Sequence, residues 1–259
     1  MRHSLFSKIF YQKRRVLVAW LLGMVAMAAL TMVFYPSFKS GGFDLSSLPP
    51  ALQKLVGNMA TLKTVGGYID QEIFALRMPL MVIIMSIAIF YGLISGEEKR
   101  GLLETQLSLP YSRSALLTQK LMAGLVITLL ACVGIVIGLW IALISIGEHY
   151  SYTQILADTL SCWLLSVDFG LVAFCLGALL GARGIVLGLT SGIAFLSFMV
   201  TSMAPAVSQL AAVDHLSLFH YYHTGVSSNL RDTTILLAVG VLLIGVGYVG
   251  FSGRDLSSQ

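Results

Sequence analysis

The sequence predicts an all-α integral membrane protein with six transmembrane helices, both ends in the cytoplasm, and a short amphipathic helix between the second and third helices. Its residues are 57% hydrophobic and 11% charged, and the mean hydropathy is +0.86. Soluble domains carry about 25% charged residues, so this chain lacks the polar surface of a soluble protein. The long apolar runs also show no alternation of the kind that barrel strands require.

Six apolar runs define the predicted spans, because about 20 apolar residues cross the roughly 30 Å hydrocarbon core of a bilayer. Five of the runs contain no charged residue over 19 to 30 positions, and the run 159–182 is interrupted only by Asp168. We predict spans at about 16–35, 74–96, 121–146, 155–180, 185–206 and 233–252.

The distribution of basic residues predicts the orientation. If the N-terminus is cytoplasmic, eleven of the 16 Lys and Arg residues lie on the cytoplasmic side, as the positive-inside rule requires. The first run is too long for a secretory signal, so we expect it to be retained as a span. Segment 4–15 mixes apolar and basic residues, and it is either an amphipathic helix at the inner interface or a simple flank of the first span.

The charged segment 96–120 separates the second and third spans. Near its start it has four consecutive charged residues, 97–100, which are followed by leucines, and Leu103 and Leu107 fall on one face of a short helix. Pro110 would end this helix, and Ser112 can cap the helix that follows. An ordinary cytoplasmic loop accounts for the Lys and Arg residues here but not for three glutamates, because acidic residues contribute little to orientation.

The order of residues in this segment resembles the permease subunits of type 2 ATP-binding-cassette (ABC) exporters. The matching residues are Glu97, Glu98, Gly101, Leu103, Glu104, Leu107, Pro110, Ser112, Arg113 and Lys120. The six-span layout and the segment from Ser217 to Tyr222 also look like that family. The resemblance implies that the segment is a coupling helix that docks on a separate ATPase. The implied coupling residues are Glu97, Glu98, Arg100, Gly101, Leu103, Glu104, Leu107, Pro110 and Arg113.

The resemblance further implies one transmembrane permease domain over residues 1–259 that transports rather than catalyses. The chain has no G-x-x-x-x-G-K-[ST] phosphate loop, so we expect it to bind no cofactor, with ATP and Mg²⁺ held by cytoplasmic ABC ATPase partners. It would form half of a translocation pathway, paired with an identical or a related permease. We expect it among the lipids of a bacterial or archaeal cell membrane, with no nucleic-acid partner.

Asp168 lies in the middle of the fourth predicted span. An ionisable group at that depth costs about 2.5–3.5 kcal/mol on insertion scales, so it should face protein or water. Two interpretations stay open: Asp168 is a pathway or gating residue, or it makes a hydrogen bond to a Ser, Thr or Tyr of a neighbouring span. Small residues along the fifth span, from Thr190 to Thr201, favour close helix packing over a substrate-lining role.

The histidines near the last span do not indicate a metal site. His215, His220 and His223 lack the set of carboxylate or cysteine partners that a metal site needs, so we expect no metal. Two other functions remain as alternatives to the exporter. An integral-membrane enzyme acting on lipid would need clustered catalytic groups at membrane depth, and a secondary transporter would need helices broken in corresponding halves.

Overall fold

The computed structural model describes residues 5–40, 59–103, 112–181, 184–205, 207–224 and 229–253. Within these residues six helical stretches are long and apolar enough to cross a membrane. They are Leu5–Lys39, Val65–Leu93, Arg113–Ile146, Tyr152–Leu180, Ile185–Met203 and Leu230–Ser252. The described residues contain no strand. The predicted all-α fold with six spans is therefore confirmed.

Several spans are built from more than one helical element. The first contains α1 (Leu5–Val33) and α2 (Tyr35–Lys39), and the second contains α5 (Val65–Tyr68), the π-helix η2 (Ile69–Arg77) and α6 (Met78–Leu93). The other spans are α9 (Arg113–Ile146), α10 (Tyr152–Leu180), α11 (Ile185–Met203) and α13 (Leu230–Ser252). The short elements are α4 (Met59–Leu62), α7 (Ser95–Glu98), α12 (Ser208–Ala211), η3 (Asp214–Leu216) and η4 (Leu218–Tyr221).

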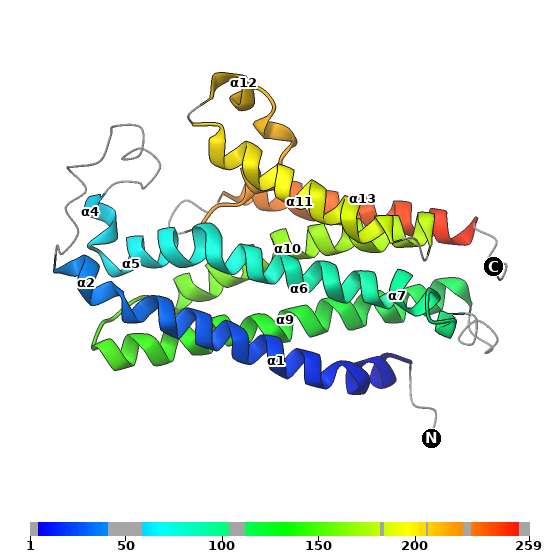
Figure 1. The fold of residues 1–259 in the computed structure, drawn as a ribbon, viewed down its shortest axis with the longest axis horizontal. Coiled ribbons are helices and arrows are strands. Elements are labelled where there is room, and N and C mark those ends of the chain that lie inside the picture. Colours follow the sequence, from blue (N-terminus) through cyan, green and yellow to red (C-terminus); the bar gives the residue numbers. More distant parts are fainter. Residues whose placement is uncertain are drawn as a thin grey trace.

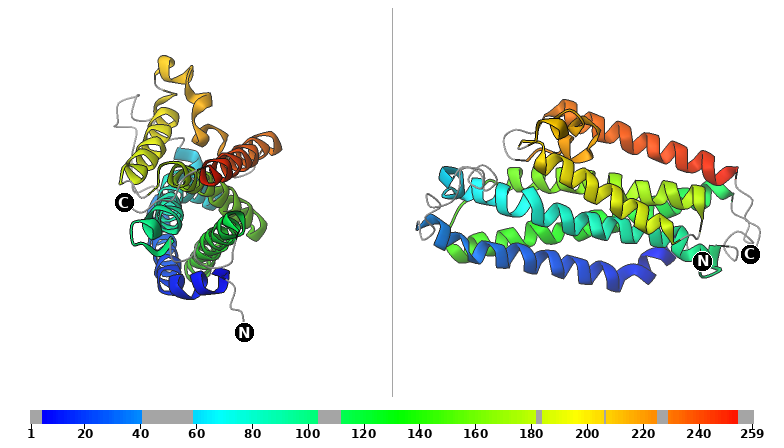
Figure 2. Two further views of the ribbon diagram at one scale, coloured as in Figure 1. Left: turned by 90° about the vertical axis from the view of Figure 1, so that its right-hand side faces the viewer. Right: turned by 45° about the horizontal axis from the view of Figure 1, so that its top comes forward.

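The spans lie roughly parallel in a bundle. Helices α1 and α9 occupy one side, α11 and α13 occupy the opposite side, and α6 and α10 lie between them (Figures 1 and 2). The beginning of α1, the end of α13 and the short helix α7 all lie at the same end of the bundle (Figure 1). We call this the α7 end. Elements η3 and η4 lie toward the opposite end, beside the beginning of α13 (Figure 1).

Every span except the fifth begins before its predicted window, while the second and fifth spans end three residues before theirs, at Leu93 and Met203. Helix α1 begins at Leu5, so residues 5–15 belong to the first span, and Leu5 and Ile9 pack into the bundle. The amide of Phe6 donates a hydrogen bond of 3.3 Å to Oε1 of Gln119 on α9. The second span begins at Val65, nine residues before the predicted start, and the guanidinium of Arg77 inside it forms an ion pair with Glu72 in the same helical stretch.

The neighbours of the third span differ from those that its short connection predicts. Residues 147–151 join α9 to α10, and a connection this short predicts a tight antiparallel pair. Instead α9 packs mainly against α1, and α10 packs mainly against α6 and α13. Glycines explain why α9 packs mainly against α1, because Gly134 and Gly138 of α9 lie against the backbone carbonyls of Leu21 and Val25. No side chain intervenes there, so the two helix backbones approach closely.

Candidate functional site

The charged segment after the second span is folded as two short helical pieces. Helix α7 covers Ser95–Glu98, and a turn at 99–101 separates it from helical residues 102 and 103. The break falls at Gly101, whose φ of 68° is in the left-handed region that glycine adopts without strain. The expected amphipathic helix is therefore interrupted at this glycine. Glu104, Leu107 and Pro110 lie outside the described residues.

A buried ion pair fastens this segment to the spans. The Nζ atom of Lys120, on α9, donates hydrogen bonds of 2.6 Å to Oε2 of Glu97 and 2.8 Å to the carbonyl oxygen of Leu93. The Lys120 side chain is fully buried, whereas the Glu97 side chain keeps 11% of its surface exposed. We call this group of three residues the Lys120 clamp. It joins α7, the end of α6 and the beginning of α9.

The predicted coupling residues face two ways. Glu97 and Leu103 are buried against the protein, while Arg100 and Gly101 are exposed to solvent. Two neighbours that were not among the predicted coupling residues, Lys99 and Leu102, are exposed as well, Leu102 to 46%. The first group anchors the segment and the second presents a surface. Arg113, also exposed, begins α9, and Ser112 caps that helix by accepting a 3.2 Å hydrogen bond from the amide of Ala115. The predicted cap at Ser112 is confirmed.

Asp168 is buried in the middle of α10 with 0% exposure. Neither carboxyl oxygen has a hydrogen-bond partner among the described residues. The interpretation that it bonds to a neighbouring Ser, Thr or Tyr is therefore wrong for the described part of the chain. Its Oδ1 atom faces Gly240 of α13, where a Cβ atom would lie only 2.9 Å away.

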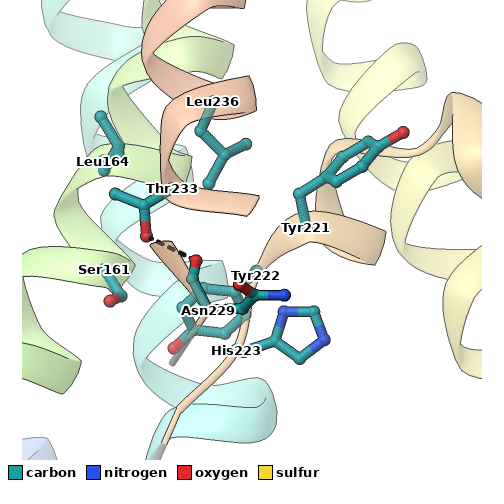
Figure 3. A pocket seen from close by; sticks show the side chains of 8 residues that line it. All are labelled: Ser161, Leu164, Tyr221, Tyr222, His223, Asn229, Thr233 and Leu236. Atoms are coloured by element: carbon teal, nitrogen blue, oxygen red, sulfur yellow. Dashed lines mark hydrogen bonds between the residues drawn. The ribbon is translucent and has the colours of Figure 1, made fainter. Parts of the chain in front are cut away.

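A hollow opens along the same contact between α10 and α13, toward the end of the bundle that holds η4. Figure 3 shows its lining side chains, which come from α10, from the segment around η4 and from the beginning of α13. They are Ser161, Leu164, Tyr221, Tyr222, His223, Asn229, Thr233 and Leu236. We call this contact the α10–α13 seam. Sequence reasoning missed Gly240 and the hollow, because only their spacing along two different helices connects them to Asp168.

Tyr222 links the hollow to the second span. Its hydroxyl donates a 2.9 Å hydrogen bond to the carbonyl oxygen of Phe74 on η2. Burial raises the pKa of the Tyr222 phenol well above its usual 10, and the nearby Cys162 and Asp158 raise it further. Tyr222 therefore stays neutral at physiological pH and acts as a hydrogen-bond donor.

The histidine segment forms a polar network beside α11. His220 Nδ1 lies 2.6 Å from Oδ2 of Asp214, and its Nε2 lies 3.2 Å from Nδ1 of His215. Thr201 donates a 2.8 Å hydrogen bond to Oδ1 of Asp214 and so ties the network to α11. No group of three or more His, Cys, Asp or Glu residues in the described chain could hold a metal ion. This network fixes η3 and η4 on the end of α11.

The small residues of α11 serve packing in the same way. Thr190 and Ala194 are buried, and Ser197 exchanges hydrogen bonds with the segment that contains η4. The hydroxyl of Ser217 donates a 2.9 Å hydrogen bond to the carbonyl oxygen of Ser197. These contacts agree with the packing interpretation of the stripe.

Comparison with known proteins agrees with these features. Residues 4–252 match the family described as multidrug efflux system permease Rv1217c, C-terminal domain. No curated protein matches the chain significantly. Because the family match covers almost all of the sequence, the chain belongs to this permease family. It is a multi-pass membrane transport permease.

Proposed function

We propose that this member of the multidrug efflux permease family is the membrane-spanning subunit of an ATP-driven ABC exporter. In this proposal the α7 end faces the cytoplasm, where eleven of the 16 Lys and Arg residues would then lie. The chain forms half of a translocation pathway and receives energy from separate ATPase subunits. The name of the family supports export of small organic compounds.

The observation that carries the proposal is the Lys120 clamp. A loop can transmit force only if it is attached rigidly to the helices that must move. Here a charged segment at the end of the bundle is held by two short hydrogen bonds from one buried ammonium. Displacement of α7 by an ATPase would therefore pull on α6 and α9 together. Such rigid-body movement is a known way to switch packed helices between two states.

The exposed side of the same segment is the proposed ATPase contact. Lys99 and Arg100 supply charge and Leu102 supplies an apolar anchor, while Gly101 sets the turn between them. Aromatic or aliphatic anchors beside charged rims are common in protein interfaces. The buried residues of the segment, Glu97 and Leu103, would act indirectly by holding this surface in place.

The experiment is co-purification in mild detergent with a candidate ABC ATPase from the same genome. We expect Arg100→Glu/Leu102→Asp to abolish co-purification while Lys8→Glu, an exposed charge reversal at the same end of the bundle, has no effect. Reversal of Glu97 is avoided because it would also break the clamp. Failure of the native chain to retain any ATPase, or equal retention by the double variant, would refute the coupling role.

A second permease copy, identical or related, would complete the pathway. Helix α11 supports this pairing because it is mostly exposed and carries Gly188 and Gly192 one turn apart. No described atom lies within 4 Å of a Cβ built on either glycine. Two small residues at this spacing let a second helix approach closely. We expect Gly188→Leu/Gly192→Leu to shift the purified chain toward monomer in light scattering, and Gly245→Leu on α13 to leave it unchanged.

A secondary transporter is the second candidate, and Asp168 is the observation that favours it. A buried carboxyl without a partner is the kind of group that ion-coupled transporters use. Inverted vesicles separate the two candidates. Uptake of an organic compound that requires ATP and survives a proton ionophore supports the exporter, whereas uptake without ATP that the ionophore abolishes supports the secondary transporter.

A further inference from the structure

The first three turns of α1 carry basic side chains without acidic neighbours. The basic residues of these turns are Lys8, Lys13, Arg14 and Arg15, and the chain contains no Asp or Glu before residue 44. None of the four forms an ion pair with an acidic side chain that the structure describes. Their charge is therefore not neutralised by ion pairs within the described part of the chain.

The packing of α1 decides which way these cations point. The helix lies at the edge of the bundle (Figure 1), and its Leu5 and Ile9 side chains are buried there. Lys13 lies on this inner side, because a Cβ atom built on Gly92 of α6 would lie 3.4 Å from its Nζ atom. The ammonium of Lys13 thus reaches toward α6, and the other three cations lie on a different side of α1.

The remaining cations face outward. Lys8, Arg14 and Arg15 are exposed. The guanidinium of Arg14 lies 4.0 Å from the centroid of the Tyr11 ring, and Tyr11 is itself 63% exposed. A cation over an aromatic ring is attracted to it, so this contact keeps the Arg14 charge on the outer side of the helix. We call Lys8, Arg14 and Arg15 the α1 basic patch.

The outer side of α1 continues beyond the patch as an apolar surface. Residues that recur at intervals of three and four share one side of a helix, and here they are Lys8, Tyr11, Arg15, Val18 and Leu22. Val18 is 53% exposed and Leu22 is 58% exposed. Leu22 lies seven residues, or about 10 Å, beyond Arg15. In a membrane this apolar surface faces lipid chains, which places the nearby arginines close to the headgroups.

The combination of charge and apolar surface identifies the partner. Basic side chains beside a membrane span attract anionic lipid headgroups. A guanidinium suits a phosphate in particular, because two of its N–H groups can bond to two phosphate oxygens at once. A soluble protein partner also suits these charges, but it does not cover Val18 and Leu22 on the same side of the helix. A phospholipid covers both parts.

We propose that the α1 basic patch binds an anionic phospholipid in the bilayer leaflet at the α7 end. Arg14 and Arg15 hold its phosphate, and its acyl chains lie along Val18 and Leu22. Lys8, about 10 Å before Arg15 along the helix, adds positive charge at the headgroup surface. This partner goes beyond the proposed transport function, because its binding needs neither the ATPase nor a transported compound.

The test is native mass spectrometry of the full chain, purified in detergent without any ATPase and titrated with phospholipid. Phosphatidylglycerol and phosphatidylcholine with identical acyl chains are compared, so that the two lipids differ in headgroup charge. We expect the native chain to bind phosphatidylglycerol more tightly. Arg14→Gln/Arg15→Gln should weaken phosphatidylglycerol binding tenfold or more, a loss of about 1.4 kcal/mol or more, and leave phosphatidylcholine binding unchanged.

Two variants control for charge and for folding. Lys99→Gln/Arg100→Gln also removes two adjacent exposed cations at the α7 end, so it should bind phosphatidylglycerol like the native chain. Arg14→Lys/Arg15→Lys keeps both charges and should retain most of the binding. Excess inorganic phosphate should not displace the lipid, because it has no acyl chains to lie on the apolar surface.

Four results would each overturn the proposal. They are equal binding of the two lipids by the native chain, an equal loss in the Lys99→Gln/Arg100→Gln control, full binding by Arg14→Gln/Arg15→Gln, and displacement by inorganic phosphate. If Arg14→Gln/Arg15→Gln keeps the lipid and instead loses a co-purifying ATPase, the patch is a protein contact. Because the lipid titration contains no ATPase, its failure leaves the exporter proposal standing, and failure of the exporter proposal leaves the lipid site standing.

Discussion

Removal of the Glu97 side chain tests how the Lys120 clamp holds the end of the bundle. In Glu97→Ala the ammonium of Lys120 keeps only one of the two hydrogen-bond acceptors described above, the carbonyl oxygen of Leu93, in a position with no solvent exposure. Loss of one partner of a buried ion pair costs about 3–5 kcal/mol, because the remaining charge stays buried. A domain of this size loses about 2–4 °C of melting temperature per kcal/mol, so we expect a decrease of about 6–20 °C.

The converse substitution should cost less. In Lys120→Met the remaining charge is Glu97, whose side chain is 11% exposed and can gain water. The double variant Glu97→Ala/Lys120→Met buries no charge at this position, so it should melt above Glu97→Ala. The measurement is thermal unfolding of purified protein in detergent, followed by size-exclusion chromatography. Lys99→Met, at an exposed cation two residues from Glu97, is the control and should melt like the native chain.

Two results would refute this reasoning. The first is a Glu97→Ala variant that melts at the native temperature, which would mean that the ammonium finds another acceptor or water. The second is a double variant that is no more stable than Glu97→Ala, which would mean that the loss comes from packing and not from an isolated charge. A double-mutant cycle separates these contributions.

Three further predictions concern packing and titration. Gly170→Ala should destabilise the chain by about 1–3 kcal/mol, because its methyl group would collide with Ser86 and Phe90; Gly245→Ala, which faces no described atom within 4 Å, should not. Gly134→Ala should also lower the melting temperature, since its methyl group would meet the backbone of α1, and an unchanged value would contradict the close approach. Burial and nearby carboxylates raise the pKa of Tyr150 to about 12, above its usual 10. Its contribution to stability is therefore complete below pH 10 and is lost toward pH 12; Tyr150→Phe should flatten that decline in unfolding measurements, and an identical pH profile would contradict it.

The spans were predictable because a bilayer demands long apolar runs, and hydropathy detects those directly. The cap at Ser112 was also predictable, since the signal lies in adjacent residues. The ends of the first two spans were not. The basic residues before position 16 appeared to precede the first span, but they belong to α1, and the second span begins at Val65, so that it includes the ion pair of Glu72 with Arg77. A local average of hydropathy counts each charged residue as polar and carries no information about whether that residue forms an ion pair.

The candidate site was predictable in part for a similar reason. Asp168 stands out in the sequence as a charge in an apolar run, and the structure adds that the described chain gives its carboxyl no partner. The opposite holds for Lys120, which matches the exporter motif in the sequence but shows there no sign of its partner. Its burial against Glu97, 23 residues earlier, depends on how α7 folds back. Pairing across that distance has no local signal.

Which helices pack together is decided by glycines whose meaning depends on the helix opposite. Gly134 and Gly138 on α9, and Gly188 and Gly192 on α11, have the same four-residue spacing in the sequence. The first pair lies against the backbone of α1, while the second pair faces no described atom within 4 Å. Within a bilayer an exposed leucine costs nothing, so hydropathy cannot rank the two faces. How closely another helix backbone can approach does distinguish the two faces. The first pair explains why α9 packs more extensively against α1 than against α10. By the same argument, the second pair is the place where a helix from outside this chain fits best.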